Sequence, residues 1–320
     1  MTVPFTELAS VTREHFMPDL IDQLYKNNPF YDRMYTQNRI MIRGGDPIHF
    51  PVSYADLGTT TSFSKSEVLP TNPTEQITKG SLNWREYVTT INLPQFDLDV
   101  NSAGGDTQLL DYMETKMDLA RRSLQDRLGV DLEATQSGKN LDGLGSVLIG
   151  ASGTYAGLST SDIADWRSKL VTIPGGLVVL YDIQKLIGKC TDGSDRPTLL
   201  LMRQSVWDRV WSLLQADQRF VRPERTGSAG FETLKVSGVD TMVDTHVDGS
   251  DGGTADNHLR CLNENYLNIF LAPWGNFKLE AVPNLKDQRV KIMRIYCALN
   301  LICRKLRVQG EIQTVDPDVD

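Results

Sequence analysis

The chain has 320 residues, of which 40% are hydrophobic and 23% are charged, so it can bury a sizeable core and does not have the composition of a disordered protein. Its 33 Lys and Arg residues against 41 Asp and Glu residues give a net charge of −8, which argues against a protein that holds nucleic acid through a basic surface. Cys190, Cys261, Cys297 and Cys303 form no CxxC pair, which favours buried free thiols in a reducing compartment. No segment has the roughly 20 apolar residues of a membrane helix, and the N-terminus lacks a signal-peptide pattern. The sequence therefore predicts a soluble protein made in the cytoplasm.

The first predicted element is a short N-terminal helix at about 10–28. Leu20, Ile21 and Leu24 form an apolar stripe at helical spacing, and Pro29 is expected to end the helix.

Two segments with strand periodicity follow, separated by a long polar stretch. Ile48, Phe50 and Val52 alternate with other residues, and a second alternating run extends from Trp84 to Leu93. Between them, 58–81 consists mainly of Thr, Ser, Pro, Gly and Lys, which is far longer than the usual connection of about 2–5 residues. We expect the two runs to pair with each other as one extended hairpin. Its polar part should project outward to meet another molecule.

The strongest helical pattern covers 106–128 and should end at Gly129. The other face of this helix is charged and polar, so one side should be buried. The buried side is predicted to contain Leu109, Met113, Met117, Ala120, Leu124 and Leu128. At about 1.5 Å per residue the helix would be roughly 35 Å long, long enough to act as a structural spine.

The remainder of the chain mixes helices and strands. The segment 137–160 is rich in Gly, Ser and Thr and is interpreted as a junction. The predicted helices are 162–170, 176–189 and 205–214, the last with Trp207 and Trp211 on one core-facing side. The predicted strands are 198–202, 233–243, 259–271 and 277–282, and a pairing of 290–302 with 304–314 is expected to close the fold.

Gly143, Gly145 and Gly150 superficially suggest a dinucleotide-binding loop. The third glycine is misplaced for that motif, and the segment follows a helix where the motif requires a strand. We interpret them as hinge or turn glycines.

No catalytic, cofactor-binding or metal site is predicted. The segment 244–257 contains several acidic residues, but it lacks the ligand spacing and late Glu of a calcium loop. A solvated acidic loop is the favoured interpretation, and a weak cation site is the alternative. His15, His49, His246 and His258 are widely separated and belong to no catalytic motif.

The order of the segments resembles a known family. The chain presents, in order, PDLIDQLYKNNPFYDRMY, GGDPIHFPVSY, a long polar stretch, WREYVTTINLP, the predicted spine helix, NLDGLGSVLIG, AGLSTSDIADWRSKL and LNENYLNIFLAP. This order is similar to that of the major capsid proteins of tailed bacteriophages, which have the Hong Kong 97 fold, and the resemblance extends over essentially the whole chain.

The resemblance implies an α+β fold with five parts. These are an N-terminal arm at 1–43, an extended E-loop hairpin with its flanking strands at 44–98, a peripheral domain with the spine helix at 99–157, an axial domain at 158–266, and a return to the peripheral domain at 267–320.

The resemblance also implies a function. The chain would be a major capsid protein, not an enzyme, and would have no cofactor. Its copies would form hexamers and pentamers of an icosahedral head enclosing double-stranded DNA without sequence-specific binding or a membrane. The head would be assembled in the bacterial host cytoplasm and become the virion capsid.

Partners and contact residues follow from the same resemblance. The expected partners are a portal, decoration proteins and a separate scaffolding protein, because the chain begins almost at the arm. The candidate inter-subunit contacts are Lys65, Glu67, Lys79 and Trp84. Some family members cross-link a loop lysine to an asparagine, but an exposed loop lysine is the ordinary state, so cross-linking through Lys65 or Lys79 is not favoured.

Two alternative functions remain open. An encapsulin-type nanocompartment would share the fold but would enclose protein cargo. A soluble two-domain hydrolase would need a pocket with perturbed titratable groups, and the sequence indicates none.

Overall fold

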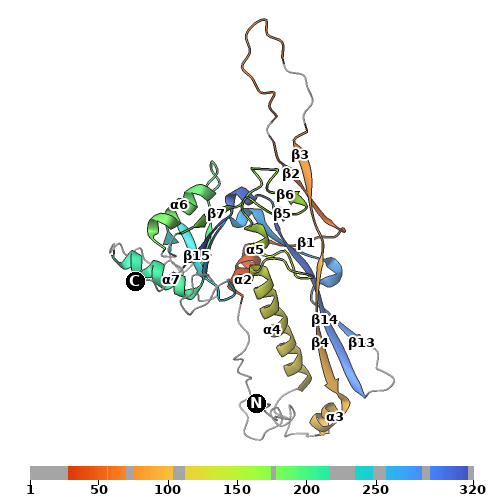
Figure 1. The fold of residues 1–320 in the computed structure, drawn as a ribbon. Helices are drawn as coiled ribbons and strands as arrows, with labels where there is room; N and C mark the ends of the chain where they lie inside the picture. Colours follow the sequence, from red (N-terminus) through yellow and green to blue (C-terminus); the bar gives the residue numbers. More distant parts are fainter. Residues whose placement is uncertain are drawn as a thin grey trace.

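The structure is a computed structural model. It describes residues 28–55, 57–69, 75–103, 112–173, 178–216, 235–247, 257–282 and 289–315. Two sheets form the body, a long helix runs beside one of them, and a hairpin projects from the body (Figure 1). Almost all of the predicted N-terminal helix at 10–28 lies outside the described residues, and so does Leu109.

The five-stranded sheet is built around one long strand, β14. Its strands are β1 (Ile40–Ile42), β12 (Leu267–Leu271), β14 (Val290–Cys303), β13 (Lys278–Val282) and β4 (Arg85–Pro94). Antiparallel to β14, β4 lies along one edge with Pro94 opposite Val290, while β12 and β13 follow one another along the other edge. The last seven residues of β14, 297–303, are all buried, as expected for a strand covered on both faces.

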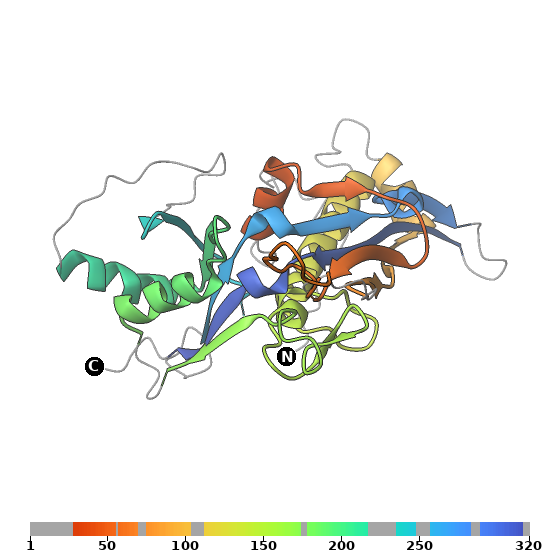
Figure 2. The ribbon, with the colours of Figure 1, turned by 90° about the horizontal axis from the view of Figure 1, so that it is seen from above.

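The six-stranded sheet forms the other end of the body (Figure 2). Its order is β7 (Lys169–Thr172), β15 (Gly310–Val315), β11 (Asn257–Leu262), β8 (Leu199–Met202), β10 (Val239–Val243) and β9 (Lys235–Val236). The buried residues form two hydrophobic cores, a main core and a smaller one under the helices α6 (Leu180–Cys190) and α7 (Gln204–Ala216). The side chains of β8 point alternately into these two cores, because successive side chains of a strand point to opposite faces of the sheet. Leu200 and Met202 pack with α6 and α7, whereas Leu199 and Leu201 belong to the main core.

The expected pairing of 290–302 with 304–314 is wrong. β14 pairs only within the five-stranded sheet, and β15 lies between β7 and β11 in the other sheet. The short 3-10 helix η4 (Leu306–Val308), whose Leu306 and Val308 are buried, carries the chain from one sheet to the other. The structure also describes the 3-10 helices η2 (Glu264–Tyr266) and η3 (Pro273–Gly275).

The spine helix is confirmed, but its end is different. α4 (Tyr112–Glu133) packs against β4 and continues through Gly129 for one more turn. A Cβ at Gly129 would lie 3.0 Å from the His246 ring, so the glycine allows a close approach and does not end the helix. The extra turn buries Leu132, which lies beyond the predicted end of the helix.

The predicted partners of the hairpin strands are also wrong. β2 (Ile48–Ser53) pairs with β3 (Ile77–Leu82), which lies partly inside the predicted polar excursion, while β4 joins the five-stranded sheet. The strand β3 was hidden in the sequence because its inward positions are Thr78, Gly80 and Leu82. Gly80 lies under the Phe50 ring, where an added Cβ would approach the ring to 2.7 Å.

Two predictions about helices are wrong: Pro29 was expected to end a helix but lies at the start of one, and 162–170 is not helical. Pro29 begins the helix α2 (Pro29–Thr36), and the Asn28 side chain accepts a hydrogen bond from the Tyr31 backbone N–H as its N-cap. Turns and the start of β7 replace the predicted helix at 162–170, because Arg167 donates to the Thr160 and Ser161 carbonyls and holds a compact turn.

The remaining elements are short. They are α3 (Gln95–Ala103), which was not predicted from the sequence, α5 (Leu144–Val147), β5 (Thr154–Tyr155) and β6 (Leu158–Ser159). The four cysteines are buried and free, as predicted. In the part of the chain that the structure describes, no helix is long and apolar enough to cross a membrane.

Candidate assembly surfaces

The projecting hairpin is the most exposed part of the described molecule (Figure 1). A backbone hydrogen bond of 3.0 Å from Tyr54 to Gln76 continues the β2–β3 ladder, and beyond it the chain forms a long loop. Large apolar side chains stand open to solvent on this loop: Val68 is 97% exposed and Phe63 68%, and Leu57 and Leu69 are also exposed. Exposed apolar groups in such density usually mark an interaction site.

The base of the hairpin is fixed to the body. Ile48, Phe50 and Val52 are buried on β2, and the Phe50 ring lies 6.4 Å from the Trp166 ring, centroid to centroid. The loop is therefore held in place by its packed base, whereas its described apolar residues Phe63 and Val68 are exposed.

The predicted contact residues fall into two groups. Lys65, Glu67 and Lys79 are exposed on the hairpin, and Glu67 accepts a hydrogen bond of 3.1 Å from the Ser64 backbone N–H in a local turn. Trp84 instead lies at the hairpin base, where it donates to the Gly45 carbonyl and packs edge-on against Trp274 at 5.5 Å between ring centroids. The apolar residues Phe63 and Val68 were not among the predicted contacts, although their residue types were visible in the sequence.

Of the predicted spine residues, Leu124 and Leu128 are buried and Met117 is half-buried. The side chain of Met113 lies outside the described part of α4.

A second exposed apolar surface lies at the end of the molecule opposite the hairpin (Figure 1). Phe96 and Val100 of α3 are both exposed and stand one helical turn apart, so they share a face. The first four residues of β13 are exposed too, including Leu279. The molecule therefore has candidate contact surfaces on the hairpin and at the opposite end, on α3 and β13.

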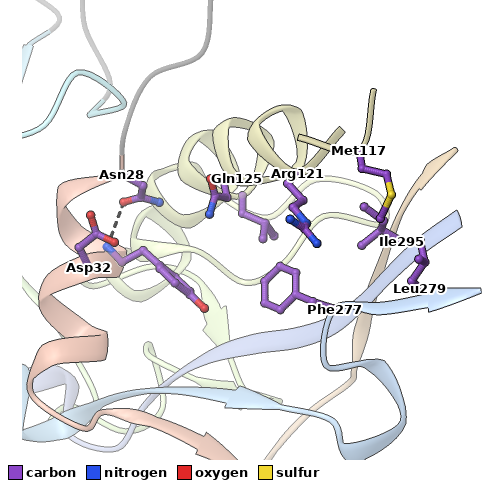
Figure 3. A pocket seen from close by; sticks show the side chains of 10 residues that line it. Asn28, Asp32, Met117, Arg121, Gln125, Phe277, Leu279 and Ile295 are labelled. Atoms are coloured by element: carbon purple, nitrogen blue, oxygen red, sulfur yellow. Dashed lines mark hydrogen bonds between the residues drawn. The ribbon is translucent and has the colours of Figure 1, made fainter. Parts of the chain in front are cut away.

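A cavity of about 370 Å³ lies between α2, α4 and the β13–β14 edge (Figure 3). Met117, Phe277, Leu279 and Ile295 form its apolar side, and Arg121 reaches across it from α4. Burial raises the pKa of Tyr31, another wall residue, to about 12. Among the described residues that line the cavity there is no His or Cys side chain and no nucleophile–base pair.

The other residues singled out in the sequence were Gly143, the acidic and histidine residues, and the pair Trp207 and Trp211. Gly143 is the N-cap of α5, and no nucleotide-binding strand–loop–helix unit surrounds it. Within the described ranges, no group of three or more His, Cys, Asp or Glu residues is placed to hold a metal ion. Trp207 and Trp211 stack at 5.3 Å within the core, as predicted.

The interpretation of 244–257 as a solvated acidic loop is wrong at its first residue. Asp244 is completely buried and accepts hydrogen bonds from the His246 backbone N–H and ring Nδ1. Residues 248–256 lie outside the described ranges. Neither the carboxylate nor the imidazole is part of an exposed loop, because Asp244 is buried and the His246 ring contacts Asp126 of α4.

Two ionic clusters join α4 to the six-stranded sheet. Arg260 of β11, 1% exposed, pairs with Glu133 at the end of α4 and with Glu311 of β15 at 3.0 Å. Burial tends to raise the pKa of Glu311, but the hydrogen bond from His258 and the Arg260 charge outweigh it and lower that pKa. In the second cluster, His246 lies between Asp244 and Asp126 of α4.

Comparison with known proteins shows the fold. No protein-family model matches the sequence, and no curated protein matches it. The chain is similar in structure to a subunit of the cyanophage A-1(L) capsid, at 15% identity and a TM-score of 0.69, covering 97% of this chain and 99% of that one. It is similar to the SrpI encapsulin of Synechococcus elongatus PCC 7942, at 11% identity and a TM-score of 0.64, covering 99% of this chain and 98% of that one. It is also similar to a chain from Mycobacterium phage Bobi, at 13% identity and a TM-score of 0.59, covering 96% of this chain and 97% of that one. The chain therefore has the Hong Kong 97-type fold over its whole described length.

Proposed function

We propose that the chain is the major capsid protein of a tailed bacteriophage, whose copies assemble into an icosahedral head around double-stranded DNA. The observation that carries the proposal is a hairpin with a packed base and a tip whose apolar side chains are not covered within the subunit. The fold shared with phage capsid subunits over nearly the full length supports it.

The energetics favour burial of the tip between copies. Burying one large apolar side chain is worth about 1.5–3 kcal/mol, and Phe63 and Val68 leave most of that gain unused in the isolated subunit. Closed symmetric assembly repeats each contact around the ring, so modest contacts accumulate. Lys65 and Glu67 are close to these residues in the sequence, and Lys79 lies on β3 opposite Pro51; all three are proposed as polar contacts at the rim.

The proposed division of the chain follows the family arrangement. It consists of an arm at 1–43, the E-loop at 44–98, a peripheral domain at 99–157, an axial domain at 158–266 and a peripheral return at 267–320. Within this division β15 pairs with axial strands, so the last strand of the return would tie the two domains together. Copies would form hexamers and pentamers, with scaffold, portal and decoration proteins as partners, assembled in the host cytoplasm.

An encapsulin-type shell is the second candidate, because the similarity to the SrpI encapsulin extends over 99% of this chain. The two functions differ in what the shell encloses. Purified native particles that contain packaged DNA support the phage head, whereas particles that contain a protein cargo support the encapsulin.

The experiment that tests assembly removes the hairpin tip and keeps its strands. Residues 55–75 are replaced with Asn-Gly, a turn suited to joining Tyr54 to Gln76. We expect the thermal melt of the subunit to change little and electron microscopy to show no shells. A double variant, Phe63→Ser with Val68→Ser, should also fail to assemble, while Thr60→Ser with Ser62→Thr should assemble normally.

Two results would contradict the proposal. Intact shells from the shortened protein would show that the tip is not an assembly contact. A strictly monomeric wild-type chain at all concentrations, with its scaffold coexpressed, would remove the shell function itself.

A further inference from the structure

His246 links two parts of the molecule that are distant in sequence. It follows β10 of the six-stranded sheet, and its side chain is only 3% exposed. Ring Nδ1 lies 2.8 Å from Asp244 Oδ1, and ring Nε2 lies 3.3 Å from Asp126 Oδ1 on α4. The imidazole therefore bridges the sheet segment and the spine helix.

The bridge requires a protonated ring. Ionised carboxylates only accept hydrogen bonds, and a neutral imidazole carries a single N–H, so it can serve one of the two aspartates but not both. Only the imidazolium donates on both sides and offsets the two negative charges. Asp244, completely buried, has the larger need for this partner, since burying an unpaired charge is costly.

Among the residues that the structure describes, the ring nitrogens of His246 contact the two aspartates and no other titratable side chain. From α4 the charged group that faces it is Asp126, and from its own segment it is Asp244. The Arg203 guanidinium, after β8, donates to the neighbouring Thr245 carbonyl at 2.9 Å. The Asn28 amide beside α2 approaches the same helix turn at Gly129 and is neutral.

We propose that the Asp126–His246–Asp244 bridge is a pH-sensitive joint between α4 and the six-stranded sheet, closed by the imidazolium and loosened when the ring becomes neutral. The Arg260 cluster also joins α4 to the six-stranded sheet, and it stays ionic because a guanidinium is charged at all physiological pH values. Loss of the His246 proton would thus loosen one of two connections and leave the other in place. The inference concerns a single subunit and does not depend on the proposed function.

The direction of the pH dependence follows from the environment. The hydrogen bond to Asp244 is the largest influence on His246 and raises its pKa above 6.5, with Asp126 acting in the same sense and burial opposing both. A group whose pKa is raised by folding contributes stability that is fully present below its unfolded pKa. That stability is lost as the pH rises through the higher folded value.

The test compares melting temperatures of the full-length wild type and His246→Gln from about pH 5.5 to about pH 9, a range that spans the expected loss. We expect the wild type to melt roughly 2 °C higher at the acidic end and the difference to vanish at the alkaline end. The matched control is His49→Gln, on the exposed side of β2, whose difference from the wild type should not vary with pH. A His246→Gln difference that is constant across the range overturns the proposal.

A second variant keeps the test decisive if His246→Gln does not fold. Asp126→Asn removes one of the two charges at a position that is 31% exposed. It should reduce the acidic-side advantage and move the loss of stability to lower pH. Nuclear magnetic resonance titration of the His246 ring in the wild type and in Asp126→Asn should show a lower His246 pKa in the variant. An unchanged His246 pKa overturns the proposal.

Discussion

At the residue scale, the buried ions of the molecule lie where its parts meet. Arg260, Glu133 and Glu311 come from β11, α4 and β15, and each is almost fully buried. Desolvation makes such a cluster a weak source of net stability, but it makes every member dependent on the others. The cluster therefore determines how the end of the spine helix is seated on the six-stranded sheet.

Replacing Arg260 with Leu should destabilise the protein by about 3–5 kcal/mol, because Glu133 and Glu311 would remain buried without a cation. Denaturant unfolding of the two proteins measures the loss. Arg289→Ala is the matched control, since the Arg289–Asp99 pair at 2.7 Å is largely exposed and worth at most about 1 kcal/mol. Equal unfolding midpoints for wild type and Arg260→Leu would show that the cluster is not a structural joint.

At the element scale, α4 is the part that periodicity predicted best. Leu124 and Leu128 lie on the buried face as their spacing indicates, and Leu132 extends that face beyond the expected end. The end was misplaced because a glycine that follows a helical pattern usually ends the helix. Here the glycine is needed for contact with His246, a residue more than a hundred positions away.

Met117→Pro should cost about 3 kcal/mol or more, because proline removes a backbone hydrogen bond and clashes in the helix interior. We expect insoluble or unassembled protein, measured by solubility and electron microscopy. Glu114→Ala, an exposed position in the same helix, should behave as the wild type. Normal shells from Met117→Pro would mean that the helix does not need to be continuous for assembly.

At the scale of the whole molecule, the acidic charge bears on how a shell would hold a genome. A net charge of −8 gives no general attraction to phosphates, so a capsid built from this chain would enclose DNA without binding it tightly.

Purified unassembled protein should therefore bind duplex DNA weakly, with a Kd above about 1 µM at near-physiological salt. Fluorescence anisotropy with a labelled duplex measures this affinity, and a basic DNA-binding protein of similar size serves as the positive control. Submicromolar binding that weakens steeply with salt would show that a local basic surface overrides the net charge.

The sequence by itself determined those local elements that have a clear apolar period. Apolar spacing predicted the spine helix, the strand at Ile48–Val52 and the helix with Trp207 and Trp211, because burial on one face leaves a period that can be counted. The length and polarity of 58–81 also predicted a projecting segment, although β3 occupies its last residues and its tip is more apolar than expected.

Only the tertiary structure decided which strands pair and which charges meet. β2 was expected to pair with the run at 84–93 but pairs with β3. The segment 290–302 was expected to pair with 304–314, but the two segments belong to different sheets. Strand periodicity records which face is buried and carries no information about the neighbour across the hydrogen bonds. The Arg260 and His246 bridges were hidden for the same reason, since their directly paired residues are separated by up to 127 positions in the sequence. They meet only because α4 packs against the six-stranded sheet.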